Sequence, residues 1–255
     1  SEGIEVKQTF PAPAQFIAEL HRPENLASTR EFYPTNDALV EGIAKAYQQV
    51  IKELYEAGAR TIQLDDCTWG TIVSENPEGI ATKDQLNSED KEEAEKAQTR
   101  EKLKELYITV NNLALEGAPE DLVINTHVCR GNYHSDWATE GAYNEVATPL
   151  FDRGNYQAYF LEYDTDRAGG FEPLAHISDD KVVVLGLVTS KDGVLEDRQT
   201  LIDRIHEAAE YVPLDRLCLS PQCGFASTEE GNILTEEEQW EKIKLVQSVA
   251  EEVWG

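Results

Sequence analysis

A histidine and a cysteine stand two positions apart near the end of a predicted strand. The apolar run 122–124 leads into the segment NTHVCRGN (125–132), which opens into a glycine-containing loop. Residues two apart in a strand point to the same face, so His127 and Cys129 present an imidazole and a thiol side by side. Both groups bind zinc in proteins, but the spacing also fits two strand residues half-buried in a core.

A second segment far downstream favours the metal interpretation. In LCLSPQCGF (217–225), Cys223 follows another short apolar strand at a turn rich in proline and glycine. Two further cysteines lie near strands, and we expect both to be buried and structural: Cys67 follows Asp65 and Asp66, and Cys218 stands between two leucines.

The elements that must position these side chains alternate between strand and helix. We expect six strands, at 4–10, 61–66, 122–129, 158–163, 181–188 and 216–220. We expect helices at 37–57, 88–115, 143–151, 196–211 and from a capping box at Thr235 and Glu238 to the C-terminal end. Near-continuous apolar strands separated by helices indicate a parallel sheet that is covered on both faces.

This order predicts an α/β fold, a TIM (β/α)8 barrel of which about six of the eight strands are represented. We interpret residues 1–255 as one barrel domain that lacks its first two βα units. The chain does not begin with methionine and contains none, which fits a missing N-terminal portion.

In such a barrel the chemistry lies at the C-terminal ends of the strands. Three strand ends that face the same mouth carry His127, Cys129, Glu162 and Cys223. Two thiolates, one imidazole and one carboxylate suit Zn(II), which accepts sulfur, nitrogen and oxygen ligands. Glu162 fits this set less specifically, because it could equally form an ion pair with Arg130 or Arg167.

Composition excludes several classes of partner. The chain has 49 acidic and 22 basic residues and a net charge of −27, which disfavours binding to nucleic acid or to an anionic membrane. We find no run of 18 apolar residues and no signal peptide. Four cysteines in a chain of this size without a secretion signal favour a reducing cytoplasm and metal or catalytic roles over disulfides.

Four motifs together resemble the catalytic domain of cobalamin-independent methionine synthase, and more closely its shorter stand-alone bacterial relatives: QLD (63–65), NTHVC (125–129), FLEYD (160–164) and SPQCG (220–224). The resemblance covers the chain from Phe10 onward and implies a TIM barrel. It also implies a zinc ion bound by His127, Cys129, Glu162 and Cys223. The implied activity is transfer of a methyl group, with a methyl-folate as donor, to homocysteine in methionine biosynthesis, with Asp65 binding the amino group of homocysteine.

One segment departs from the family pattern. Where the family has Asp-Ile-His-Ser after the fifth strand of this chain, the sequence reads LVTSK (187–191), so Lys191 is the candidate for the proton-transfer role of the missing histidine. This leaves the methyl donor open more than the thiol acceptor. The alternatives are a corrinoid protein as donor, a different thiol as acceptor, or an inactive or binding-only barrel.

Two aromatic residues complete the candidate site. Trp69 could stack on a flat donor or pack at the rim, and His134 could contact substrate or lie on the surface. We expect small-molecule partners and allow for a homodimer.

Overall fold

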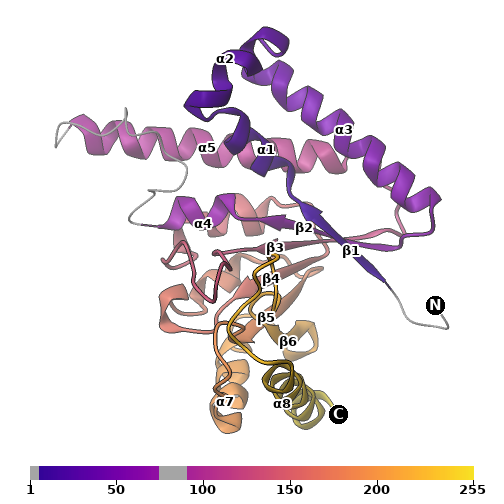
Figure 1. Cartoon of the computed structure of the whole chain (residues 1–255), viewed down its shortest axis with the longest axis vertical. Helices are drawn as coiled ribbons and strands as arrows, with labels where there is room; N and C mark the ends of the chain where they lie inside the picture. The colour runs from indigo at the N-terminus through magenta and orange to yellow at the C-terminus, as the bar shows by residue number, and fades with distance from the viewer. Residues whose placement is uncertain (1–5, 75–90) are drawn as a thin grey trace.

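Six strands form one parallel sheet in which every strand pairs with its neighbours in chain order (Figure 1). This arrangement comes from a computed structural model, which describes residues 6–74 and 91–255, with only the backbone for 91–98. The strands are β1 (Lys7–Pro11), β2 (Thr61–Asp66), β3 (Val123–Val128), β4 (Ala158–Glu162), β5 (Val182–Val188) and β6 (Leu217–Pro221). The six predicted strands and their parallel α/β arrangement are therefore confirmed, although the start of the first lies outside the described residues.

Helices connect the strands, as a parallel sheet requires. They are α1 (Pro13–Leu20), α2 (Pro23–Phe32), α3 (Asn36–Glu56), α4 (Thr68–Val73), α5 (Lys91–Leu115), α6 (Asn144–Val146), η2 (Ala147–Asp152), η3 (Asp166–Ala168), η4 (Glu172–His176), α7 (Arg198–Ala208), η5 (Leu214–Arg216) and α8 (Glu236–Trp254). The first three gather at the β1 side of the sheet, whereas α7 and α8 lie together at the β6 side (Figure 1). The predicted start of α5, at 88–90, lies outside the described residues.

Local sequence signals fix the ends of the longer helices. Thr35 caps α3 by accepting a hydrogen bond from the backbone of Ala38, and Gly58, at φ +106°, ends the same helix in a left-handed conformation. The capping box predicted at Thr235 and Glu238 is present at the start of α8.

The two faces of the sheet differ in composition. One face, which we call the helix face, carries apolar side chains that are almost completely buried and that form one cluster with residues of α1, α3, α5 and α7: Ile62, Leu64, Ile124, Val128, Leu161, Val183 and Leu185. The alternate residues form the inner face, which is largely polar: Lys7, Gln63, Asp65, Asn125, His127 and Glu162. Side chains two apart share a face, so each strand divides its residues between core and site.

The sheet is curled toward its inner face. β1 and β4 are separated by two strands, which in a flat sheet would place them about 14 Å apart. The Nζ atom of Lys7 on β1 nevertheless lies 4.0 Å from the ring centroid of Phe160 on β4. Such curvature is that of a barrel wall.

The expectation that Cys218 is a core residue is wrong. Cys218 is exposed, and its pairing with Val184 places it on the inner face rather than in the apolar cluster of the helix face. Leucines on both sides, Leu217 and Leu219, occupy the opposite face and do not cover it.

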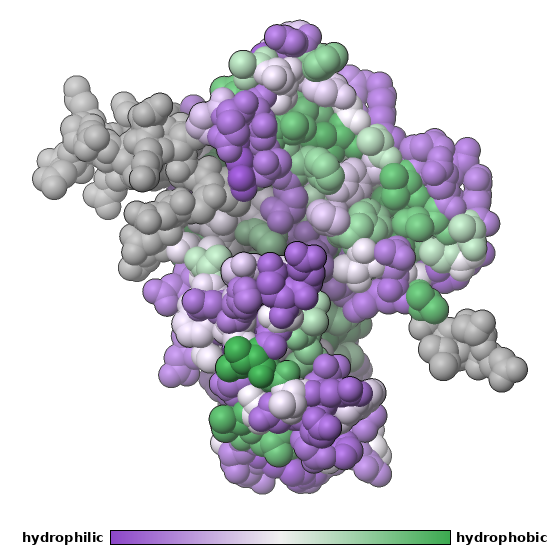
Figure 2. Space-filling model, viewed as in Figure 1, coloured by the Kyte–Doolittle hydropathy of each residue, from purple (hydrophilic) through white to green (hydrophobic). Residues whose placement is uncertain are grey.

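The surface is mostly hydrophilic on the face drawn in Figure 2, where hydrophobic residues form small separate patches. Across the described segments, every helix is too short or too polar to cross a membrane.

Candidate metal centre

The four predicted ligand residues converge at one end of the sheet. His127 is near the end of β3, Cys129 follows that strand directly, Glu162 is the last residue of β4, and Cys223 follows β6 by two residues. One ligand atom from each lies within 4.8 Å of the other three. Segments nearly a hundred residues apart thus build one cluster of two thiols, one imidazole and one carboxylate.

The strand register explains why these side chains meet. Asp65, His127 and Phe160 are successive partners across β2, β3 and β4, and Glu162 lies two residues beyond Phe160 on the same face. Asp66, by contrast, points to the helix face, where it is fully buried and accepts hydrogen bonds from Thr68 and Asn111. The adjacent residues Asp65 and Asp66 therefore lie on opposite faces of the sheet.

The cluster has the chemistry of a cation site. Nε2 of His127 is buried, and within the described part of the chain no group makes a hydrogen bond to it; the nearest carboxylate oxygen, Oε1 of Glu162, is 3.5 Å away. A tetrahedral zinc site with bonds of about 2.0–2.3 Å separates its ligand atoms by roughly 3.3–3.8 Å. The types of the four ligand atoms therefore fit a zinc ion, and their spacing fits it once the atoms move slightly closer together.

The groups of the cluster shift one another's pKa values. The neighbouring Cys129 thiol, together with His127, lowers the pKa of Cys223 to about 4 despite burial. Burial alone would lower the pKa of His127, but the adjacent Cys223 and Glu162 raise it well above its usual value. Cys223 is therefore poised as a thiolate, the form in which cysteine binds metals.

Cys129 has a third thiol as a neighbour. The thiols of Cys223 and Cys67, together with burial, raise the pKa of Cys129. Cys67 follows β2 and is partly exposed rather than fully buried, and it lines a cavity of about 320 Å³ with Pro11 and Phe16.

Glu162 is held on both carboxylate oxygens. Oε1 accepts the backbone N–H of Arg130 at 3.1 Å, while Oε2 accepts from Nη2 of Arg167 at 2.9 Å and from Nε2 of Gln222 at 3.3 Å. Burial raises the pKa of Glu162, but His127, Arg130 and Arg167 lower it overall. The carboxylate is therefore ionised and fixed, and the ion pair predicted with Arg167 coexists with the place of Glu162 in the cluster.

Lys191, in the segment after β5, contacts the loop after β3 that carries the predicted ligand Cys129. Its buried Nζ donates to the backbone oxygen of Gly131 at 2.7 Å and to Oδ1 of Asn132 at 2.8 Å. Asn132 in turn donates to the backbone oxygen of Gly224, next to Cys223, at 2.7 Å. Sequence reasoning missed Asn132 and Gln222, although both lie within three residues of a predicted ligand.

The remaining predicted site residues are dispersed. Asp65 is partly exposed on the inner face and accepts a hydrogen bond from Gln63 at 2.9 Å. Trp69 is completely buried in α4 with its ring edge-on to Tyr107, so it offers no open ring face to a ligand. His134 is exposed in the loop after β3, with a left-handed backbone, beside Tyr133.

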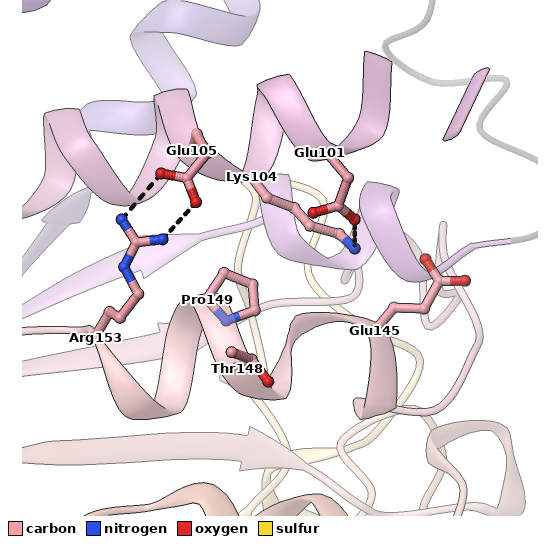
Figure 3. Close-up of a pocket in the computed structure, with 7 residues that line it drawn as sticks. All are labelled: Glu101, Lys104, Glu105, Glu145, Thr148, Pro149 and Arg153. Carbon is pink, nitrogen blue, oxygen red and sulfur yellow. Dashed lines mark hydrogen bonds and ion pairs between the residues drawn. The ribbon is translucent and has the colours of Figure 1, made fainter. Parts of the chain in front are cut away.

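A separate pocket of about 290 Å³ lies among the helices between α5 and η2 (Figure 3). Its rim consists of ion pairs that link Lys104 with Glu101 and Arg153 with Glu105 (Figure 3). None of the four clustered residues lines it, so it is distinct from the candidate metal centre.

Known proteins resemble this chain over most of its length. The uncharacterized protein YxjG of Bacillus subtilis (strain 168) is 46% identical over 252 residues, which are 97% of this chain and 61% of YxjG. A methionine synthase of Saccharolobus solfataricus is 25% identical over 197 residues, covering 77% of this chain and 47% of that protein. The chain thus spans about three fifths of the length of YxjG.

Solved structures show the same fold. A crystal structure from Listeria monocytogenes, assigned as a vitamin-B12-independent methionine synthase, matches with a TM-score of 0.71 and 32% identity, over 100% of this chain and 66% of that one. A B12-independent methionine synthase from Shewanella sp. W3-18-1, solved with selenomethionine, matches with a TM-score of 0.67 and 20% identity, over 98% and 62%. These neighbours confirm that the curled sheet is part of a TIM barrel. The profile of the cobalamin-independent synthase catalytic domain matches residues 27–251, and the chain belongs to this family.

Proposed function

We propose that this chain carries the catalytic centre of a zinc-dependent methyltransferase that converts homocysteine to methionine. The observation that carries the proposal is the convergence of four ligand atoms within 4.8 Å, one of them the buried imidazole nitrogen of His127, to which no described group makes a hydrogen bond. Membership of the cobalamin-independent synthase family supports the same chemistry.

His127, Cys129, Glu162 and Cys223 would hold the zinc ion. When bound, zinc would act as a Lewis acid that lowers the pKa of a coordinated thiol, so that the thiol is a thiolate at neutral pH. The hydrogen bonds to Glu162 and the thiolate character of Cys223 prepare the site for a cation before one arrives. The chain's own residues therefore provide a preorganised, mainly anionic cradle.

Asp65 is suited to bind the ammonium group of homocysteine. Its carboxylate lies on the inner face directly opposite His127 in the strand register, so an amino acid held there places its sulfur toward the cluster. The sulfur then attacks the donor methyl carbon, so a sulfur–carbon bond forms while the bond from that carbon to the donor breaks. The electron pair of the broken bond stays with the donor.

A methyl-folate donor, whose nitrogen keeps this electron pair, needs a proton, and Lys191 is the candidate source. Burial lowers the pKa of Lys191, which makes the ammonium a better acid, although nearby anionic groups oppose the shift. Two of its three N–H bonds are directed at Gly131 and Asn132, which leaves one for a ligand. His134, exposed at the rim, would contact the substrates.

A second candidate reaction keeps the thiol chemistry and changes the partners. The segment after β5 carries Lys191 rather than a histidine, and the buried Trp69 has no ring face open to a pterin. These observations favour comparing 5-methyltetrahydrofolate with a methylated corrinoid protein as donor, and homocysteine with other thiols as acceptor. We propose a cytoplasmic location and small-molecule acceptors in either case.

The zinc content of the full-length protein tests the proposal. We expect about one zinc per chain in the wild type and in a Cys218→Ser control, whose thiol is exposed on the inner face outside the cluster, and loss of zinc in Cys223→Ser. Homocysteine should change the zinc X-ray absorption spectrum of the wild type. Wild-type protein without zinc would contradict the proposal and favour a binding-only barrel. A Cys223→Ser protein with full zinc and full activity would contradict the assignment of Cys223 as a ligand.

A further inference from the structure

The two carboxylate oxygens of Glu162 have different partners. Oε1 faces the cluster, 3.5 Å from Nε2 of His127, and the one hydrogen bond that it accepts from the described residues comes from the backbone N–H of Arg130. Oε2 receives a charged donor from Arg167 at 2.9 Å and the amide of Gln222 at 3.3 Å. One oxygen is therefore available to a cation, and the other is already occupied.

Arg167 is itself rigidly held. Its side chain is only 4% exposed, and Nη2 also forms an ion pair with Asp164 at 2.8 Å. Nη1 donates to Oγ1 of Thr165 at 2.9 Å, and the guanidinium carbon lies 5.0 Å from the ring centroid of Trp137. A planar guanidinium fixed on several sides positions its partner more precisely than a mobile lysine would.

We propose that Arg167 is a positioning residue that reserves Oε2 of Glu162, so that the carboxylate binds the metal through Oε1 alone. This inference rests on the proposed metal site. A carboxylate that offers both oxygens raises the coordination number, whereas a single oxygen with one imidazole and two thiolates gives the four ligands that zinc prefers. Partners that hydrogen-bond to metal ligands commonly change metal affinity by 10- to 100-fold.

A matched arginine provides the control. Arg204 is also partly buried and packs over an aromatic ring, that of Phe171, at 5.2 Å. It donates to the backbone oxygen of Tyr163, the residue after Glu162, but does not contact the Glu162 carboxylate in the described structure. Removal of either guanidinium disturbs the same loop, and only Arg167 touches the proposed ligand.

The experiment compares Arg167→Met, Arg167→Lys and Arg204→Met in the full-length protein. Zinc affinity is measured by competition with a chromophoric chelator, and the visible spectrum of the cobalt(II)-substituted protein reports coordination number. Thermal unfolding of the metal-free proteins corrects for lost stability. We expect Arg167→Met to lower zinc affinity about 10- to 100-fold and to weaken the cobalt absorption as the coordination number rises. Arg167→Lys should recover part of both, and Arg204→Met should leave both unchanged.

Two results would overturn the inference, and they differ in what else they reject. If the wild type binds zinc and cobalt(II) and Arg167→Met binds them with the same affinity and spectrum, the positioning role falls while the proposed function stands. If the wild type binds neither metal, the proposed function falls and the role of Arg167 with it.

Discussion

The helix face and the inner face of the sheet are built from the same six strands but differ in role: the helix face packs in the apolar core, and the inner face carries the polar residues of the candidate site. On the helix face, residues such as Leu64 and Leu161 are buried in one apolar cluster with the helices. On the inner face, Asp65, His127 and Glu162 alternate with them and interact mainly through polar contacts. Strand alternation thus lets stability and chemistry be changed almost independently, one residue apart.

The largest difference between the faces should appear on β4. We expect Leu161→Ala to lower the free energy of unfolding by about 2–5 kcal/mol, because it leaves a cavity in the apolar cluster. The neighbour Phe160 is only partly buried on the inner face, so Phe160→Ala should cost about half as much or less. Urea denaturation of the two variants measures both free energies of unfolding. Equal losses of stability would contradict the conclusion that the helix face contributes more to stability than the inner face.

A smaller difference is expected at the adjacent aspartates of β2. Asp66 accepts from Asn111, which itself accepts the backbone N–H of Ala14, so the carboxylate ties β2 to α5 and α1. Asp66→Asn should destabilise the protein by about 1–3 kcal/mol, because an amide NH₂ then faces the NH₂ of Asn111.

Asp65→Asn is the control for this change. It should alter stability by less than about 0.5 kcal/mol while raising the KM for the proposed substrate, homocysteine. A stable Asp66→Asn protein, or an Asp65→Asn protein with unchanged KM, would argue against assigning the two residues to different faces.

The smallest effect is spectroscopic and confined to the inner face. In the metal-free protein, Cys223 should be a thiolate at neutral pH, because its pKa is lowered to about 4. Acidification toward that value adds the proton, so the ultraviolet thiolate absorbance should fall there rather than near pH 8–9 as for an ordinary cysteine. Cys223→Ser should remove the signal and Cys218→Ser should retain it; a thiolate that appears only in alkaline solution would contradict the lowered pKa.

Periodicity in the sequence was sufficient to predict the sheet and the four clustered residues. β2 and the helix α3 were predicted within one residue at each end, because apolar alternation and terminal caps are local signals. The ligand cluster followed from the rule that parallel strands end at one mouth. The proximity of these residues was therefore predictable wherever strand order alone determines it.

Prediction failed where the chain departs from the regular alternation of strand and helix. It also failed where long-range contacts determine the position of a side chain. The helices α1 and α2 were missed, although each has a proline in its first turn, a common helix start. Trp69 lies in α4, directly after β2, so strand parity does not predict where its ring points. The contacts of Arg167 with Glu162 and of Gln222 with Glu162 depend on loop geometry that no spacing rule encodes.

The distance in sequence between the proposed ligands has a consequence for folding. His127 and Cys223 are separated by 223 − 127 = 96 positions, and β3 through β6 must all be assembled before their side chains can meet. A metal bound there would act as a cross-link that closes a very long loop, and a covalent link of that span restricts the unfolded chain by about 4–5 kcal/mol. The same ion that activates a thiol would then also fasten the β3–β6 half of the barrel against unfolding.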